Sequence, residues 1–388
     1  MLLTNAFDPD PRVHNEARSL VERGYDVTLI CWDRERKKPA HEVIDGIKVE
    51  RIYVKSTHGR GITQMLYLGI FWLKAFFRAT RMRFDIVHCH DFDTLLLGYI
   101  ISILYKYKIV YDAHESYVDM LYQSLPKWLL NSIKGIEDYL IKRVDLLITV
   151  GSLLEEDFKK RGAKETCVVG NWKRLEDFNI PKEKIDREKK RLGIENKNLI
   201  LSYIGWFSKQ RKLNELLEAV ASTPGVHLLI GGDGPEKGTV ESAARNSNNI
   251  TFLGYVKPDD IPLYTAISDA VVYSFDENNP NSRFSAPNKL FEAIAGGKAI
   301  ISGDFGEIGK IIREEGCGLS LTATSKDKFL EAFGTLRDHD TLEKYHNNSY
   351  KTGQKKYNWS NAKNILLKSY DLLSPMSYEP IAKAGASQ

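Results

Sequence analysis

The feature that most constrains this chain is an alternation of short, β-branched strand patterns with helical stretches, which occurs twice. Strand patterns of the first half lie at residues 27–31, 47–54, 86–89, 109–112 and 146–150. Those of the second half lie at 199–204, 226–230, 250–253, 270–275, 299–302 and 319–321. Strands that alternate with helices favour a parallel sheet covered on both faces. The chain is therefore predicted to form two doubly wound, Rossmann-like α/β domains.

A charged stretch without this alternation separates the halves and predicts the domain boundaries. Residues 1–172 are assigned to an N-terminal domain, 173–198 to a linker and 199–355 to a C-terminal domain. Helical periodicity continues beyond them, and residues 356–374 are expected to form a helix that packs back on the first domain. Residues 375–388 lack periodicity and are assigned to a tail. A length of 388 residues with 43% hydrophobic side chains is sufficient for two cores.

The first helix has clear end signals. Asp10 can accept hydrogen bonds from the first turn, Pro11 suits the first helical position, and Gly24 suits the left-handed end. We therefore expect an ordinary packing helix between these residues.

Charge and cysteine usage exclude several classes of protein. A net charge of +4 is too small for a concentrated nucleic-acid-binding surface, so no nucleic-acid partner is expected. The four cysteines form no CxxC pair and no secreted-type framework, which indicates reduced thiols and a cytoplasmic protein. Asp8, Asp10 and Arg12 follow the short opening segment at once, so no secretory signal is expected there. The longest apolar stretch, residues 62–80, is interrupted by Gln64, Lys74 and Arg78, and no transmembrane helix is predicted.

Unusual residues follow two strands of the second half, where ligands of open parallel sheets bind. The loop after 199–204 contains Lys209, Arg211 and Lys212, which can hold a diphosphate, although a solvated basic loop would look the same. Gly232 and Gly234 of a GDGP segment permit close backbone approach to a ligand, although a tight turn explains them equally well.

A third feature follows residues 270–275, where a long polar loop leads into a helix. Ser285 is predicted to cap this helix and Pro287 to occupy its first turn, so that open backbone amides form an anion site. Glu292 lies five residues beyond Pro287, roughly 7.5 Å along the axis, and can accept hydrogen bonds from a ribose diol. The ordinary alternative is that Glu292 is a solvent-exposed carboxylate without a ligand. Its apolar neighbours argue against exposure.

These segments resemble glycosyltransferase family 4, a family of retaining enzymes with the two-lobed GT-B fold. The resemblance rests on Gly205, the basic loop, the GDGP segment and FEAIAGGKAI at 291–300. It implies a central cleft between the domains, with Arg211 on the donor diphosphate and Glu292 on the ribose. It also implies that the donor-binding residues include Lys209, Gly232, Asp233, Gly234, Ser285, Pro287, Asn288 and Lys289.

The first half resembles the family in its opening segment and in FDIVHCHDFDTL and KIVYDAHE. By the resemblance, His114 faces the donor sugar; by itself, it would more often be a core or loop histidine. The implied activity is retaining transfer of a hexosyl or N-acetylhexosaminyl group from a UDP- or GDP-linked donor. No separate cofactor is expected.

Two positions depart from the family pattern. Phe284 stands where the first glutamate of a Glu-x7-Glu segment is usual, and Trp206 stands where an arginine is often found. Asp276, Glu277 and Arg283 are candidate substitutes for the missing sugar contact.

Other site chemistries fit the sequence less well. Asp91 and Asp93 match a metal-binding DxD pattern, but helix capping explains them better. His88 and His90 could bind zinc, but no third ligand stands nearby in sequence, so no metal is predicted. No GxGxxG or phosphate-loop motif supports a dehydrogenase or an ATPase. A sugar-nucleotide 2-epimerase and a catalytically silent sugar-nucleotide-binding protein remain as alternatives.

Residues 65–83 and 126–143 interleave aromatic and basic side chains. This pattern suits peripheral contact with an anionic membrane, although core aromatics covered by cations would give the same pattern. The expected acceptor is a glycan or a lipid-linked molecule, and the expected location is the cytoplasm, at the inner face of the cell membrane.

Overall fold

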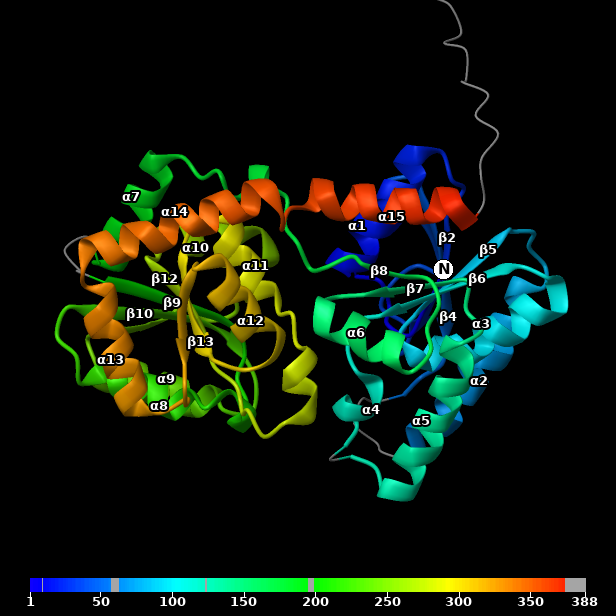
Figure 1. Cartoon of the computed structure of the whole chain (residues 1–388), viewed down its shortest axis with the longest axis horizontal. Coiled ribbons are helices and arrows are strands. Elements are labelled where there is room, and N and C mark those ends of the chain that lie inside the picture. The colour runs from blue at the N-terminus through cyan, green and yellow to red at the C-terminus, as the bar shows by residue number, and fades with distance from the viewer. Residues whose placement is uncertain (9, 57–62, 123, 195–198, 374–388) are drawn as a thin grey trace, which may run out of the picture.

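The computed structural model describes residues 1–8, 10–56, 63–122, 124–194 and 199–373, and the predicted tail at 375–388 lies outside this range. The described chain forms two α/β lobes side by side (Figure 1). This confirms the predicted fold class.

The first lobe is built on an eight-stranded sheet in the order β3-β4-β2-β1-β5-β6-β7-β8, in which all neighbours are parallel except β3 and β4. Buried side chains form one cluster beneath α2, α3 and α5 and another beneath α1 and α15, so both faces of the sheet are covered. The strands are β1 (Leu2–Leu3), β2 (Thr28–Asp33), β3 (His41–Ile44), β4 (Ile47–Tyr53), β5 (Ile86–His90), β6 (Lys108–Ala113), β7 (Leu146–Thr149) and β8 (Thr166–Val168). The helices are α1 (Pro11–Arg23), α2 (Thr63–Ala79), α3 (Phe92–Tyr105), α4 (Tyr117–Met120), α5 (Lys127–Ile141) and α6 (Ser152–Lys160).

The second lobe has a fully parallel six-stranded sheet in the order β11-β10-β9-β12-β13-β14. Helices α8, α9 and α13 pack on one face, and α10, α11 and α12 on the other. The strands are β9 (Leu199–Trp206), β10 (Val226–Asp233), β11 (Ile250–Phe252), β12 (Ala270–Tyr273), β13 (Ala299–Gly303) and β14 (Gly318–Leu321). The helices are α8 (Leu213–Ala221), α9 (Lys237–Asn246), α10 (Ile261–Ile267), α11 (Asn288–Ala295), α12 (Gly306–Glu315) and α13 (Lys326–Leu336), together with short 3-10 turns that include η2 (Lys209–Arg211) and η4 (Pro280–Phe284).

The end signals of the first helix are confirmed. The Asp10 carboxylate accepts the N–H groups of Arg12 and Val13, and Gly24 ends the helix at φ 103°. These local rules need no long-range contact, which is why the sequence predicts them well.

Three elements depart from the sequence-based expectations. The segment expected as a linker contains α7 (Lys182–Leu192), which packs on α10 and belongs to the second lobe. The helix was not predicted because its sequence is strongly charged and none of its described side chains is fully buried, which leaves no clear apolar face. Strands β3 and β8 were also missed, because both lie at the edges of the first sheet and are too short for a clear pattern.

Two segments cross between the lobes beside each other. The chain passes from the first lobe to the second through Lys173 and returns between α14 (His339–Lys355) and α15 (Trp359–Leu373), which run across the top of Figure 1. Lys173 and Asn358 pair at this crossing, and the Lys173 carbonyl accepts the Trp359 N–H at 2.9 Å. Helix α15 then lies against α1 and β8 of the first lobe.

A carboxylate also joins the lobes directly. Glu307 of α12 accepts the N–H groups of Ser152 and Leu153 at 2.9 and 2.8 Å. These are the first amides of α6, where a helix favours negative charge. Gly151 makes room for this contact, since a Cβ there would lie 2.9 Å from the Glu307 carboxyl carbon. The interface therefore combines apolar packing of α6 and α12 with a charged helix cap.

The GDGP bend is packed against the end of β9. A Cβ on Gly232 would lie 1.9 Å from the Gly205 carbonyl oxygen, and one on Gly234 would lie 2.3 Å from that of Phe207. Both glycines have φ of 143°, which other residues rarely adopt. The close backbone approach that these glycines permit is thus to the neighbouring strand.

We expect Gly232→Ala to lower the thermal midpoint of unfolding by about 6–12 °C, because backbone strain and overlap together cost about 3 kcal/mol. Gly238→Ala is the matched control, since Gly238 lies two residues into α9 with open space around its Cβ position. That change should leave the midpoint unaltered or slightly raised. Circular dichroism measures both, and equal midpoints for the two variants would contradict this role of Gly232.

Candidate functional site

A cavity of about 650 Å³ lies between the lobes at the carboxyl ends of their strands. The first lobe contributes His114, Glu115 and Asn171 to its lining. The second lobe contributes Ile204, Gly205, Trp206, Arg211, Gly232, Asp233, Tyr255, Val256, Ile261, Tyr273, Asn281, Ser285, Ala286, Pro287, Asn288, Lys289 and Glu292. Most of the residues predicted to bind the donor are thus brought to one place.

Two cations of the second lobe lie on aromatic rings in this cavity. The Arg211 guanidinium donates a hydrogen bond to the Tyr273 hydroxyl, and the Lys289 ammonium lies 4.6 Å from the centre of the Tyr203 ring. Within the described chain, no carboxylate approaches either cation within ion-pair distance. Burial lowers the pKa of Lys289 to about 8, against the opposing attraction of Glu292. The pair therefore presents positive charge that the protein does not neutralise.

Helix α11 begins beside these cations with its first amides uncapped. Pro287 is the N-cap residue and has no side-chain acceptor, and within the described part of the chain no other side chain is seen to accept a hydrogen bond from the first turn. The prediction that Ser285 caps this helix is wrong, because its hydroxyl lies 3.3 Å from the Tyr273 hydroxyl instead. The free amides and the two cations together form a site that favours an anion.

Glu292 lies on α11 and is largely buried, with 7% of its surface exposed. Its carboxylate is 3.5 Å from the Lys173 ammonium, which also donates to the Asn288 side chain at 2.7 Å. Because Lys173 lies at the crossing between the lobes, this contact fixes Glu292 in the cavity wall.

Two predicted donor-binding residues lie elsewhere. Lys209 is exposed and does not line the cavity, and Gly234 lies behind Gly232 against Phe207. Lys212 of the same basic loop pairs with Glu277 at 3.1 Å. The sequence could not show which cation of this loop points inward, because the 3-10 turn η2 turns neighbouring side chains in different directions.

His114 follows β6 and is surrounded by acidic groups. Its ring Nε2 lies 3.1 Å from an Asp112 oxygen, and its backbone N–H donates to the Asp91 carboxylate. Burial alone would lower the pKa of His114, but Asp91 and Asp112 outweigh this effect and raise the pKa to about 9. His114 is therefore a cation at neutral pH. Asp91 holds this loop and does not cap α3 as predicted.

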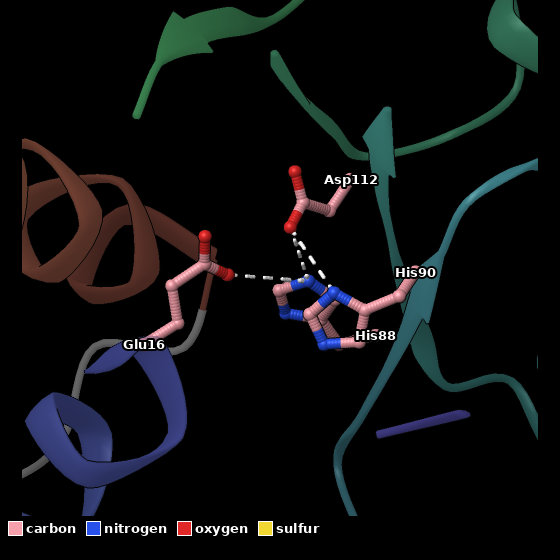
Figure 2. A group of neighbouring side chains, drawn as sticks. All are labelled: Glu16, His88, His90 and Asp112. Atoms are coloured by element: carbon pink, nitrogen blue, oxygen red, sulfur yellow. Dashed lines mark hydrogen bonds and ion pairs between the residues drawn. The ribbon is translucent and has the colours of Figure 1, made fainter. Parts of the chain in front are cut away.

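A buried cluster lies behind His114. Glu16 of α1, His88 and His90 of β5 and Asp112 of β6 point toward one another (Figure 2), and their potential ligand atoms all lie within 4.8 Å. Two potential ligands that are distant in sequence, Glu16 and Asp112, thus lie beside the two histidines in space. A cation is already present, because the Arg12 guanidinium contacts Asp112 at 2.5 Å and Glu16 at 3.0 Å. The histidines could hold a metal only in competition with this charge.

The two residues that depart from the family pattern, Phe284 and Trp206, lie in different surroundings. Phe284 is buried in the core, and Trp206 is exposed at the cavity. The candidate substitutes lie outside the cavity lining: Glu277 pairs with Lys212, and the Arg283 guanidinium lies over the Phe284 ring. Four further lining residues were not predicted from the sequence: Glu115, Asn171, Tyr273 and Asn281. Glu115 could have been predicted, because it directly follows His114.

Two family models match the chain in succession. The model described as Glycosyltransferase Family 4 matches residues 12–172, and the model described as Glycosyl transferases group 1 matches residues 184–355. The chain belongs to the GT-B glycosyltransferases.

Two curated relatives are similar to this glycosyltransferase. An uncharacterized glycosyltransferase of Methanocaldococcus jannaschii is 22% identical over 377 residues, which cover 93% of each chain. The alpha-monoglucosyldiacylglycerol synthase of Acholeplasma laidlawii is 24% identical over 220 residues, which cover 52% of this chain and 55% of that protein.

Solved structures share the fold. Sucrose-phosphate synthase from Thermosynechococcus elongatus has a TM-score of 0.79 at 17% identity, and 96% of this chain and 98% of that chain are covered. The Anabaena protein HepE, in complex with UDP and glucose, has a TM-score of 0.74 at 16% identity with the same coverage.

We predict that the affinity of this glycosyltransferase for UDP falls about tenfold as pH rises through about 8. Lys289 is charged below its pKa and neutral above it, so the anion site loses a charge-assisted contact, and such contacts contribute about 1.5–3 kcal/mol. Calorimetric titration between pH 6.5 and 9.5 measures the effect. Lys289→Arg should move the fall to higher pH, whereas the exposed Lys209→Met should leave the profile unchanged. A flat wild-type profile would argue against Lys289 as a phosphate contact.

Proposed function

We propose that this chain transfers a hexose or an N-acetylhexosamine from a UDP- or GDP-linked donor to an acceptor at the first lobe, with retention of configuration and without a metal ion. The observation that carries the proposal is the convergence of Arg211, Lys289, the open start of α11 and Glu292 in one cavity between the lobes. Such a set of groups matches the charges and hydrogen-bond donors of a nucleoside diphosphate.

The donor fits this cavity in one direction. Its diphosphate lies at Arg211, Lys289 and the first amides of α11, and its ribose reaches Glu292 one turn further along that helix. Its base extends away from the first lobe, toward Tyr255 and Val256. The sugar then faces the first lobe, where the acceptor must approach. The UDP and glucose bound in HepE support a donor of this class.

The chemistry needs stabilised negative charge on the leaving diphosphate. Breaking the anomeric bond gives an oxocarbenium-like sugar and places charge on the phosphate oxygens, which the two unpaired cations and helix amides stabilise in a partly dry site. These groups supply the charge that a metal ion provides elsewhere. His114 is protonated at neutral pH and therefore cannot take the proton from the acceptor hydroxyl. In the retaining mechanism implied by the resemblance to family 4, the leaving phosphate accepts it.

Donor binding and turnover test this proposal. In a thermal-shift panel of nucleoside diphosphates and their sugars, UDP or GDP should stabilise the fold, by about 2.7 kcal/mol at a ligand concentration of a hundred times Kd. Transfer should persist in EDTA, and the anomeric proton coupling of the product should show retention. Glu292→Ala and Arg211→Ala should each lower kcat/KM by at least about tenfold. Glu277→Ala, outside the cavity, is the control.

The same assay separates the two alternative functions. Conversion of the donor into its 2-epimer would identify an epimerase, and binding without turnover across an acceptor panel would identify a silent binding protein. Unchanged turnover of the Arg211 and Glu292 variants at low donor concentration would contradict the proposed donor site.

The first lobe also exposes a large apolar surface. Helices α2, α3 and α5 are neighbours, and they carry most of the exposed large apolar side chains of the described chain. These are Met65, Leu66, Ile70, Leu73, Phe77, Ile100, Ile103, Leu104, Tyr105, Trp128, Ile136 and Tyr139. Helix α2 packs Phe71 and Ala75 inward while Leu73 and Phe77 face solvent, so core packing explains only one side of it.

We propose that this surface docks on the anionic inner face of the cell membrane and that the acceptor is lipid-linked. Lys74, Lys106, Lys127 and Lys134 lie on or beside the same helices and can face lipid phosphates. The relative named for diacylglycerol glycosylation supports a lipid acceptor. Among the described residues, no helix has both the length and the apolar character needed to cross a bilayer.

Liposome flotation tests membrane docking. We expect the wild type to float with vesicles of phosphatidylcholine and phosphatidylglycerol at low salt, and Leu73→Glu with Phe77→Glu to reduce the bound fraction at least about fivefold. Tyr350→Glu changes an equally exposed side chain on α14 of the second lobe and should have no effect. Flotation of the double variant at the wild-type level would contradict the assignment of this surface.

A further inference from the structure

The sugar-facing wall of the cavity contains a polar pair that joins the two lobes. The Asn281 amide nitrogen donates to a Glu115 carboxylate oxygen at 2.7 Å. Glu115 follows His114 in the first lobe, and Asn281 lies in η4 of the second, so the pair forms only when the lobes meet. Both residues line the cavity.

The local structure fixes Asn281 in place. Asn279 begins η4, and its side-chain oxygen accepts the Asn281 N–H at 3.0 Å. In the same turn, Phe284 is directed into the core. Asn281 is therefore the residue of this turn that offers hydrogen-bonding atoms to the cavity.

The pair has acceptor capacity that the protein does not use. The Asn281 side-chain oxygen is buried and has no hydrogen-bond partner within the described chain. A carboxylate accepts hydrogen bonds at two oxygens, and only one oxygen of Glu115 is bonded to Asn281. Within the described chain no basic group lies within ion-pair distance of Glu115, whereas the charge of His114 is shared with Asp91 and Asp112. Burial raises the pKa of Glu115, against the hydrogen bond from Asn281 and the charge of His114. The wall is thus rich in hydrogen-bond acceptors.

We propose that Glu115 and Asn281 select the donor sugar: they accept hydrogen bonds from its hydroxyls, the exocyclic C6 hydroxyl among them, admit a neutral hexose or N-acetylhexosamine, and reject a hexuronic acid. This inference rests on the proposed function. Hydroxyl and amide groups of a neutral sugar supply the donors that two neighbouring acceptors require. A hexuronic acid keeps the ring hydroxyls but carries an ionised carboxylate in place of the C6 hydroxyl. That carboxylate donates no hydrogen bond, leaves the buried Asn281 oxygen unpaired and repels Glu115. Selection against the charged sugar therefore comes from the wall itself.

The test compares UDP-glucose with UDP-glucuronic acid in wild type and Glu115→Gln, a substitution that keeps the shape and removes the charge. Calorimetry should show that the wild type prefers UDP-glucose by at least about thirtyfold. The ratio of the two affinities should fall at least about tenfold in Glu115→Gln, while the affinity for UDP alone stays unchanged. Asn281→Asp adds a second carboxylate and should weaken both sugars but not UDP. Glu277→Gln, with its carboxylate outside the cavity, should behave as the wild type.

The outcomes separate this inference from the proposed function. If the wild type binds GDP more tightly than UDP, the test uses GDP-mannose and GDP-mannuronic acid in place of UDP-glucose and UDP-glucuronic acid. Failure of the wild type to bind either diphosphate contradicts the proposed function, and with it this inference. Binding of UDP with an unchanged sugar ratio in Glu115→Gln overturns the inference alone. Equal loss of turnover with every donor, at an unchanged binding ratio, also overturns it, because Glu115 would then act in proton transfer.

Discussion

The structure of the site depends on two cations that no carboxylate of the described residues approaches within ion-pair distance. Arg211 and Lys289 lie against the rings of Tyr273 and Tyr203, whose electron-rich faces stabilise positive charge without neutralising it. A carboxylate in the same position would cancel the charge that an anion needs. The lowered pKa of Lys289 shows the cost of this arrangement, and a bound diphosphate would remove that cost.

This arrangement requires the two lobes to be held in a defined relation. Glu307 caps α6 across the interface, Lys173 links the crossing segment to Glu292, and the Asn171 side chain donates to the Ala286 carbonyl at 3.0 Å. Each contact joins an element of one lobe to the cavity wall or interface of the other. The same geometry therefore sets the width of the cavity and the meeting of Glu115 with Asn281.

The first lobe contributes a positive side chain, His114, whose charge is held by neighbouring carboxylates and not by aromatic rings. Arg12 and Asp112 are buried partners behind the site, and Asp112 also holds His114. The Tyr370 hydroxyl on α15 contacts His88 at the rear of this cluster. The returning C-terminal helix thus contributes to the packing behind His114.

Local sequence determined most of the strands, the helix ends of α1, the glycine bend at Gly232, and the positions of His114, Arg211 and Glu292 near strand or helix ends. These features follow from periodicity, backbone sterics and the rule that parallel strands share a carboxyl edge. Only the tertiary structure decided that Lys289 and not Lys209 accompanies Arg211, that Ser285 contacts Tyr273, and that Glu115 meets Asn281, which lies 166 residues away. The reason is physical: side-chain direction in short turns and contacts across an interface are set by the packing of distant elements, which leaves no periodic trace in the sequence.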